Sequence, residues 1–166
     1  MRDKKRQLIE AALRCFAQKG YHATSIQDIV AAAGSAKVSL YAYFDSKEDV
    51  LLAALKYVFD QVMQSFGAVA REDSGDTRQR LVQLLKLHYS IHVEHSEFIM
   101  ALMEERAFQL NEDLEAFLPK VERMTFRVYR RPLLDLYGPD VAPYLYDLLL
   151  DIHSLILQWT KLLVAD

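Results

Sequence analysis

The stretch SAKVSLYAYF, positions 35–44, places a lysine, a serine and two tyrosines where a buried helix would carry aliphatic side chains. An ammonium can donate hydrogen bonds to guanine or to phosphate, and a serine hydroxyl to a base edge or to the backbone. A phenol can bond a phosphate oxygen while its ring covers a sugar. We therefore expect Lys37, Ser39 and Tyr43 to point away from the core, towards nucleic acid.

The local sequence predicts two short helices that would present these side chains. Ser25 and Asp28 form a capping-box pattern at the start of a helix over 25–33, and Gly34 ends it. After this glycine turn a second helix is expected at about 36–43. Two short helices joined in this way make a helix-turn-helix, whose second helix can lie in the DNA major groove. Lys47 begins the next helix and adds a cation beside the same strand.

Helical periodicity dominates the whole sequence and predicts an all-α fold, with a helix-turn-helix domain over 1–47 and a helical body over 48–166. We find no convincing strand pattern, and 71–76 is the most turn-like segment. The expected helices span about 4–19, 25–33, 36–43, 46–66, 77–95, 97–109, 112–137 and 140–165.

Charge and composition restrict the function classes. Residues 1–47 hold eight basic and four acidic side chains, although the whole chain has a net charge of −3, so a polyanion would meet one end only. No apolar run approaches the roughly 20 residues that cross a bilayer, and we expect a cytoplasmic protein without membrane contact. The single cysteine, Cys15, excludes an internal disulfide and a cysteine-cluster metal site.

The run from Leu8 to Leu52 resembles the DNA-binding domain of the tetracycline-repressor (TetR) family of bacterial transcriptional regulators. The matching motifs are F-A-x-K-G-Y-x-A-T-S-I-x-D-I-V-x-A-A-G and K-x-S-L-Y-x-Y-F-x-S-K-E-D-V-L. The resemblance implies a homodimer that binds a pseudo-palindromic, double-stranded DNA operator. It also implies release of the operator when a small-molecule inducer enters the C-terminal body. We expect no catalysis and no cofactor.

The resemblance also assigns roles to individual residues of the helix-turn-helix. It places Ser25 and Gln27 near the DNA backbone and an adjacent base. The turn and the recognition helix hold Ser35, Lys37, Val38 and Ser39, and the phosphate-contacting positions are Tyr41, Tyr43 and Lys47. Tyr41 can also pack partly inward.

Two positions depart from the family pattern. Ala36 lacks the hydroxyl that would cap the recognition helix, a loss of about 1 kcal/mol unless Ser35 takes over. Val38 stands where the family often has glycine, and its methyl groups suit a thymine methyl.

Basic residues precede the first predicted helix. If the chain binds DNA as this family does, DNA phosphates would be approached by Lys4, Lys5 and Arg6, together with Arg2. The alternative is that these residues form a solvated tail.

Histidines interrupt the apolar stripe of the helix expected over 77–95. His88 and His92 are one turn apart, a spacing that can ligate a metal with Glu104 or Glu105, but it also fits pocket walls or plain packing. We assign no metal. The candidate pocket residues are His88, Tyr89, His92, Met103, Phe126 and Trp159.

The segment from Tyr144 to Val164 is apolar around more than half of its circumference, which predicts burial against the body and against a partner subunit. The chain then stops without room for the usual final helix of the family. Either this member is short or the chain is incomplete.

No Gly-rich phosphate loop, G-x-S-x-G or HExxH motif indicates an enzyme. The leading hypothesis is a ligand-responsive DNA-binding repressor. The alternative is a DNA-binding assembly factor whose body binds a protein partner and no inducer.

Overall fold

The structure is a computed structural model that describes residues 2–71, 76–110 and 112–164. These residues form helices and no strand, which confirms the predicted all-α fold. The α-helices are α1 (Arg2–Lys19), α2 (Ile26–Ala32), α3 (Lys37–Tyr41), α4 (Lys47–Arg71), α5 (Thr77–Glu94), α6 (Ser96–Glu104), α7 (Glu112–Tyr137) and α8 (Leu145–Val164). Two short 3-10 helices, η1 (Ala107–Gln109) and η2 (Pro139–Tyr144), precede α7 and α8.

The chain divides into two compact units that are not contiguous in sequence. The first unit holds residues 1–60 and 97–118, and the second holds 61–96 and 119–166. Both α4 and α7 therefore pass from one unit into the other. The predicted boundary at 47/48 coincides with the start of α4, which lies inside the first unit.

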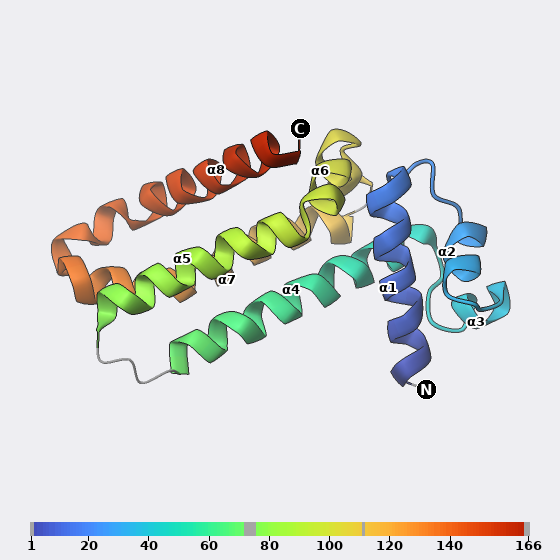
Figure 1. Cartoon of the computed structure of the whole chain (residues 1–166), viewed down its shortest axis with the longest axis horizontal. Helices are drawn as coiled ribbons and strands as arrows, with labels where there is room; N and C mark the ends of the chain where they lie inside the picture. The colour runs from blue at the N-terminus through green and yellow to red at the C-terminus, as the bar shows by residue number, and fades with distance from the viewer. Residues whose placement is uncertain (1, 72–75, 111, 165–166) are drawn as a thin grey trace. The chain divides into compact units, whose positions relative to one another are not determined.

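In the first unit, α2 packs against α1 and α3 packs against α2 (Figure 1). Its core side chains include Leu8, Ala12, Phe16, Tyr21, Ile29, Val30, Leu40, Phe44, Val50 and Leu51. The helix α6, distant in sequence, adds Phe98, whose ring centroid lies 6.4 Å from that of Phe16. Gly20 and Gly34 end α1 and α2 with φ of 78° and 57°, a left-handed conformation that glycine adopts without strain.

The two helices of the helix-turn-helix begin differently. At α2 the Ser25 hydroxyl accepts from the Asp28 amide at 3.1 Å, and the Asp28 carboxylate accepts from the Ser25 amide at 2.8 Å, which confirms the capping box. At α3 the N-cap is Ala36, which makes no side-chain cap hydrogen bond. The Ser35 hydroxyl oxygen is buried and has no hydrogen-bond partner, so Ser35 does not replace the missing cap.

In the second unit, α8 packs against α5 (Figure 1). The buried side chains at its centre are those of Phe66, Leu81, Leu84, Tyr129, Leu133 and Leu145. The helix α7 continues through Pro119 and Pro132. No helix among the described residues is long and apolar enough to span a membrane.

The uncapped start of α3 generates a stability prediction. The substitution Ala36→Ser should raise the free energy of unfolding by about 1 kcal/mol, because a serine hydroxyl at this extended N-cap can accept from a backbone amide of the first turn, where no side chain now does so. Urea unfolding followed by circular dichroism measures the change. Ala31→Ser, at an exposed position in the last turn of α2, is the matched control and should be neutral or destabilising. Equal effects of the two substitutions would contradict the capping argument.

Candidate functional site

The outward side of α3 carries Lys37 and Val38, two of the side chains that the sequence assigned to the recognition helix. Lys37 is exposed, and Val38 and Tyr41 are 82% and 52% exposed, whereas Leu40 and Phe44 are buried in the first unit. Ser39 and Tyr43 are half-buried. An exposed valine has no packing role here. The helix therefore presents Lys37, Val38 and Tyr41 on one open surface.

The start of α2 presents a second group of the expected residues. Ser25 and Gln27 are both exposed. The Ser25 hydroxyl accepts from the Asp28 amide and also donates to the Asp28 carboxylate at 2.6 Å. Because both functions of the hydroxyl are engaged, the structural role of Ser25 is to fix the first turn of α2.

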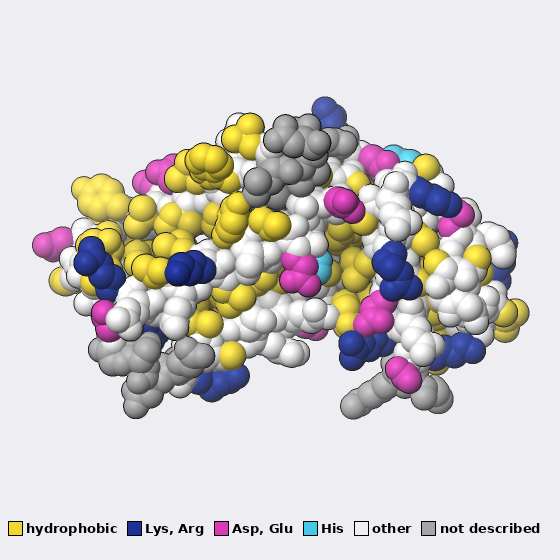
Figure 2. All heavy atoms as spheres, viewed as in Figure 1, with side chains coloured by type: hydrophobic (Ala, Val, Ile, Leu, Met, Phe, Trp, Pro, Cys, Tyr) yellow, Lys and Arg dark blue, Asp and Glu magenta, His cyan; other side chains and the backbone are white. Residues whose placement is uncertain are grey.

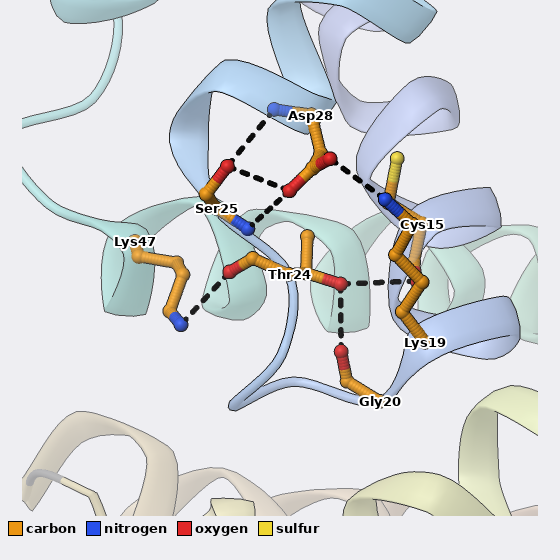
Figure 3. A network of polar contacts seen from close by, with 7 residues as sticks. All are labelled: Cys15, Lys19, Gly20, Thr24, Ser25, Asp28 and Lys47. Atoms are coloured by element: carbon orange, nitrogen blue, oxygen red, sulfur yellow. Dashed lines mark hydrogen bonds and ion pairs between the residues drawn. The ribbon is translucent and has the colours of Figure 1, made fainter.

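Lys47 has an internal partner that sequence reasoning missed. Its ammonium donates to the Thr24 carbonyl oxygen at 3.0 Å (Figure 3). It also donates to the Tyr21 carbonyl oxygen at 3.0 Å and lies 3.5 Å from that of His22. It also stands 4.2 Å from the centroid of the Tyr21 ring. This cation therefore holds the loop between α1 and α2 to the start of α4, and a phosphate contact by Lys47 stays a prediction.

The same loop is fixed from its inner side by Thr24 (Figure 3). The buried Thr24 hydroxyl lies within hydrogen-bond distance of the carbonyl oxygens of Cys15, at 3.0 Å, and Gly20, at 2.6 Å. Lys19 pairs with Asp28 at 2.7 Å, and this ammonium together with the Ser25 hydrogen bonds holds the pKa of Asp28 well below its ordinary value. The hydrogen bond of Thr24 and the ion pair of Lys19 with Asp28 therefore connect the helix-turn-helix to α1.

The basic residues near the N-terminus belong to a helix, which corrects the expectation of a tail. The helix α1 begins at Arg2, so Lys4, Lys5 and Arg6 all lie within its first turns, where the backbone is ordered by helical hydrogen bonds. The Lys5 ammonium lies 5.3 Å from the Phe44 ring centroid. The Arg6 guanidinium pairs with Glu10 at 2.8 Å, whereas Lys4 is exposed.

The candidate pocket residues of the body are not all brought together. His88 and His92 are buried side by side, with ring centroids 5.1 Å apart, and Phe126 is half-buried. Tyr89, Met103 and Trp159 are exposed, Trp159 to 59%. Met103 belongs to the first unit and the other five residues to the second.

A third imidazole joins the pair. His153 of α8 has its ring centroid 5.8 Å from that of His88 and 5.4 Å from that of His92. The sequence suggested Glu104 or Glu105 as a partner of the histidines. Glu105 instead accepts a hydrogen bond from the His22 amide at 2.9 Å. The side chain of Glu104 lies outside the described residues. His153 had a sequence signal, because it stands four residues after Leu149 and three before Ile156, on the inward face of its helix.

Tyr129 of α7 anchors one of these imidazoles. Its hydroxyl donates to the Leu84 carbonyl at 3.0 Å and lies 3.1 Å from Nδ1 of His88. Burial lowers the pKa of His88 to about 3 and that of His92 to about 4, and neighbouring imidazoles add to both shifts. Burial also lowers the pKa of His153, and the charge of Glu122 opposes that shift. All three rings are therefore neutral at physiological pH.

Comparison with known proteins gives matches over the helix-turn-helix and beyond it. The sequence model described as bacterial regulatory proteins, tetR family, matches residues 8–54. The uncharacterized HTH-type transcriptional regulator YuxN of Bacillus subtilis is 34% identical over 149 residues, which cover 89% of this chain and 50% of that protein. The fatty acid metabolism regulator protein of the same species is 29% identical over 124 residues, covering 70% and 63%.

A solved structure extends the likeness over most of both chains. The crystal structure of a TetR-family transcriptional regulator from Bordetella parapertussis 12822 has a TM-score of 0.71 and 30% identity, and the match covers 94% of this chain and 82% of that one. By contrast, the chain spans about half to two thirds of the length of the curated relatives named above.

The internal bonds of Lys47 generate a prediction about stability. Lys47→Met should lower the free energy of unfolding by about 1–2 kcal/mol, because the Tyr21 and Thr24 carbonyls lose a charged donor. Urea unfolding measures the difference from the parent protein. Lys37→Met, which removes the same charge from an exposed position of α3, is the matched control. Equal losses in the two variants would show that the carbonyl contacts contribute nothing.

The histidine cluster generates a prediction about pH. The folded-state pKa values of His88 and His92 lie below the ordinary 6.5, so below pH 6.5 the unfolded chain binds protons that the folded chain does not. The free energy of unfolding is therefore highest above pH 6.5 and falls as the pH drops below it. At pH 5 each imidazole should reduce the free energy of unfolding by about 2 kcal/mol. Unfolding measured between pH 7.5 and about 5 in the presence of a chelator tests this, with the double variant H88Q/H92Q as the comparison. Parallel curves for the two proteins would refute it.

Proposed function

This chain belongs to the TetR family of bacterial regulatory proteins, and from that premise we propose that it is a transcriptional regulator. In this proposal a homodimer binds a pseudo-palindromic operator and releases it when a small molecule binds to the body. The observation that carries the proposal is the open surface of α3, where Lys37, Val38 and Tyr41 are exposed on a helix whose opposite side is buried.

The proposed base contacts come from Lys37, Val38 and Ser39, which α3 would place in the major groove. Lys37 is long and flexible enough to donate to a guanine or to a phosphate. Val38 offers only methyl groups, so its contribution would be apolar contact with a thymine methyl. Gln27, exposed at the start of α2, would reach an adjacent base, and Ser35 would lie at the turn.

The proposed backbone contacts surround this helix. Tyr41 and Tyr43 would bond phosphates through their phenols. Lys4 and Lys5 would add cations from the first turns of α1, where helical structure fixes their spacing. Lys47 would meet a phosphate only if its ammonium kept or exchanged its bonds to the loop carbonyls.

The proposed partner of α8 is α8 of a second copy of this chain. One side of this helix packs in the second unit, yet large apolar side chains remain exposed along it, and they gather on the face shown in Figure 2. They are Tyr146, Leu150, Leu155, Trp159 and Leu162. Such a surface favours association with another protein surface. A second copy fits best, because a pseudo-palindromic operator needs two recognition helices related by a twofold axis.

The proposed response to a small molecule would act through α6. This helix lies in the first unit with the helix-turn-helix, and the Glu105 carboxylate that follows it accepts from the His22 amide in the loop before α2. A shift of α6 would therefore pull on the loop that positions α2. Fatty acids and their acyl thioesters are the first effectors to test, since one relative is a fatty acid metabolism regulator. We assign no catalytic role, and DNA binding in a bacterium implies a cytoplasmic location.

Operator selection from random DNA, followed by fluorescence anisotropy, tests the contacts. Val38→Gly should change the preferred base at one position of each half-site, because the apolar methyl contact is lost. The double variant K4A/K5A should instead weaken binding to all sequences alike and reduce the salt slope by about 0.9 per lost contact. Lys86→Ala, at an exposed position of α5 in the second unit, is the charge control and should bind as the parent does.

An unchanged base preference in Val38→Gly would show that Val38 does not contribute to recognition of the base sequence. Failure of the parent protein to select any sequence would overturn the proposed function. In the same assay, loss of operator binding on addition of a fatty acyl compound would support the proposed response. Operator binding that no small molecule changes would instead favour the assembly-factor alternative.

A further inference from the structure

We propose that His88, His92 and His153 form a binding site for a transition-metal ion of the zinc, cobalt or nickel type. Each offers one ring nitrogen, and these nitrogens lie within 4.8 Å of one another. The three ring centroids form a nearly equilateral triangle with sides of 5.1, 5.4 and 5.8 Å. This site is distinct from the DNA-binding surface and does not depend on the proposed regulation.

The hydrogen bonds of Tyr129 determine which nitrogen of His88 is free. Because the phenol uses its hydrogen for the Leu84 carbonyl, its oxygen can only accept from Nδ1–H of His88. The proton of the neutral ring is then on Nδ1, and Nε2 keeps its lone pair. A histidine ligand whose second nitrogen donates to a fixed acceptor is the usual arrangement around protein-bound metals.

His92 supplies an independent observation. The residue is only 9% exposed, and its Nδ1 is a buried polar atom without a hydrogen-bond partner. A buried polar atom that lacks a partner costs free energy, so each such atom calls for an explanation. A metal ion between the three imidazoles would supply the missing interaction.

The protonation state of the cluster agrees with this site. Burial lowers the pKa of all three histidines, so each ring is neutral at physiological pH, the form in which imidazole binds a metal. Plain apolar packing explains the cluster less well. Leucines would fill the same positions on α5 and α8 without three sets of polar nitrogens to desolvate.

The donor set restricts the kind of ion. Three imidazoles suit zinc and its neighbours, whereas magnesium and calcium require oxygen ligands. Tetrahedral coordination with metal–nitrogen distances of 2.0–2.1 Å separates two ligand nitrogens by about 3.3 Å. The nitrogens here lie within 4.8 Å of one another, so each pair must approach by about 1.5 Å at most. Rotation of the histidine side chains can shorten the distances by this amount. Three protein ligands leave a fourth position for water or a small anion.

The site would join two helices that are far apart in sequence. His88 and His92 lie on α5 and His153 on α8, the helix with the exposed apolar side chains. A bound ion would fix α8 against α5 and so stabilise the second unit. We therefore expect the temperature of unfolding to rise when the metal is added to chelator-treated protein.

Metal titration of the full chain, purified without a histidine tag and stripped with a chelator, tests the proposal. We expect one Zn²⁺ per chain by calorimetry, and Co²⁺ should give the intense visible absorption of a four-coordinate site. Mg²⁺ should not bind. The variants His92→Gln and His153→Gln, one on each helix, should each reduce Zn²⁺ affinity at least 100-fold. Tyr129→Phe should reduce it about 10-fold, since it leaves all three imidazoles in place but removes the acceptor that orients His88, together with the hydrogen bond to the Leu84 carbonyl.

His22→Gln, at an exposed histidine of the first unit, is the control and should bind as the parent does. Circular dichroism of each variant shows whether it is folded. The proposal is overturned if the parent protein gives no four-coordinate Co²⁺ spectrum. It is also overturned if folded His92→Gln and His153→Gln both keep the parent affinity.

Discussion

The geometry of the helix-turn-helix depends on how the backbone carbonyls between α1 and α2 find hydrogen-bond donors. A chain that leaves one helix and enters another exposes carbonyls that neither helix can satisfy. Here the Thr24 hydroxyl lies within hydrogen-bond distance of the Gly20 carbonyl, and also of the Cys15 carbonyl inside α1. The Lys47 ammonium donates to the carbonyls of Tyr21 and Thr24. These contacts join α1, the loop and α4, so the angle at which α2 and α3 leave the rest of the unit is set by side chains rather than by the loop itself.

The local part of this architecture could be predicted from the sequence. The capping box of Ser25 and Asp28 and the glycine that ends α2 depend on neighbours within a few residues, and such short-range rules can be read from the chain. The burial of Leu40 and the exposure of Lys37 likewise follow from helical spacing. Contacts between distant segments could not be predicted. No local pattern indicates that Lys47 bonds to a loop 23 residues earlier, or that His153 joins His88.

The second unit combines an apolar centre with a small polar group inside it. Phe66 and Leu84 surround Tyr129, whose hydroxyl and the adjacent imidazole satisfy each other away from water. A polar contact in such surroundings has few alternative partners, and it therefore favours one relative position of α5 and α7 over neighbouring ones. The same reasoning explains why the spacing of histidines on α5 alone was ambiguous. Their role depends on what α7 and α8 place opposite them.

The discontinuous composition of the first unit limits how the chain can be divided. Residues 97–118 return to the helix-turn-helix after the second unit has begun, and they cover apolar rings of the N-terminal segment: Phe98 packs on Phe16, and Phe117 lies 5.8 Å from Phe59 between ring centroids. A fragment cut after residue 60 would expose those rings to water. A smaller DNA-binding piece of this protein would therefore need a redesigned surface on α1 and α4, or a linker that restores the returning segment.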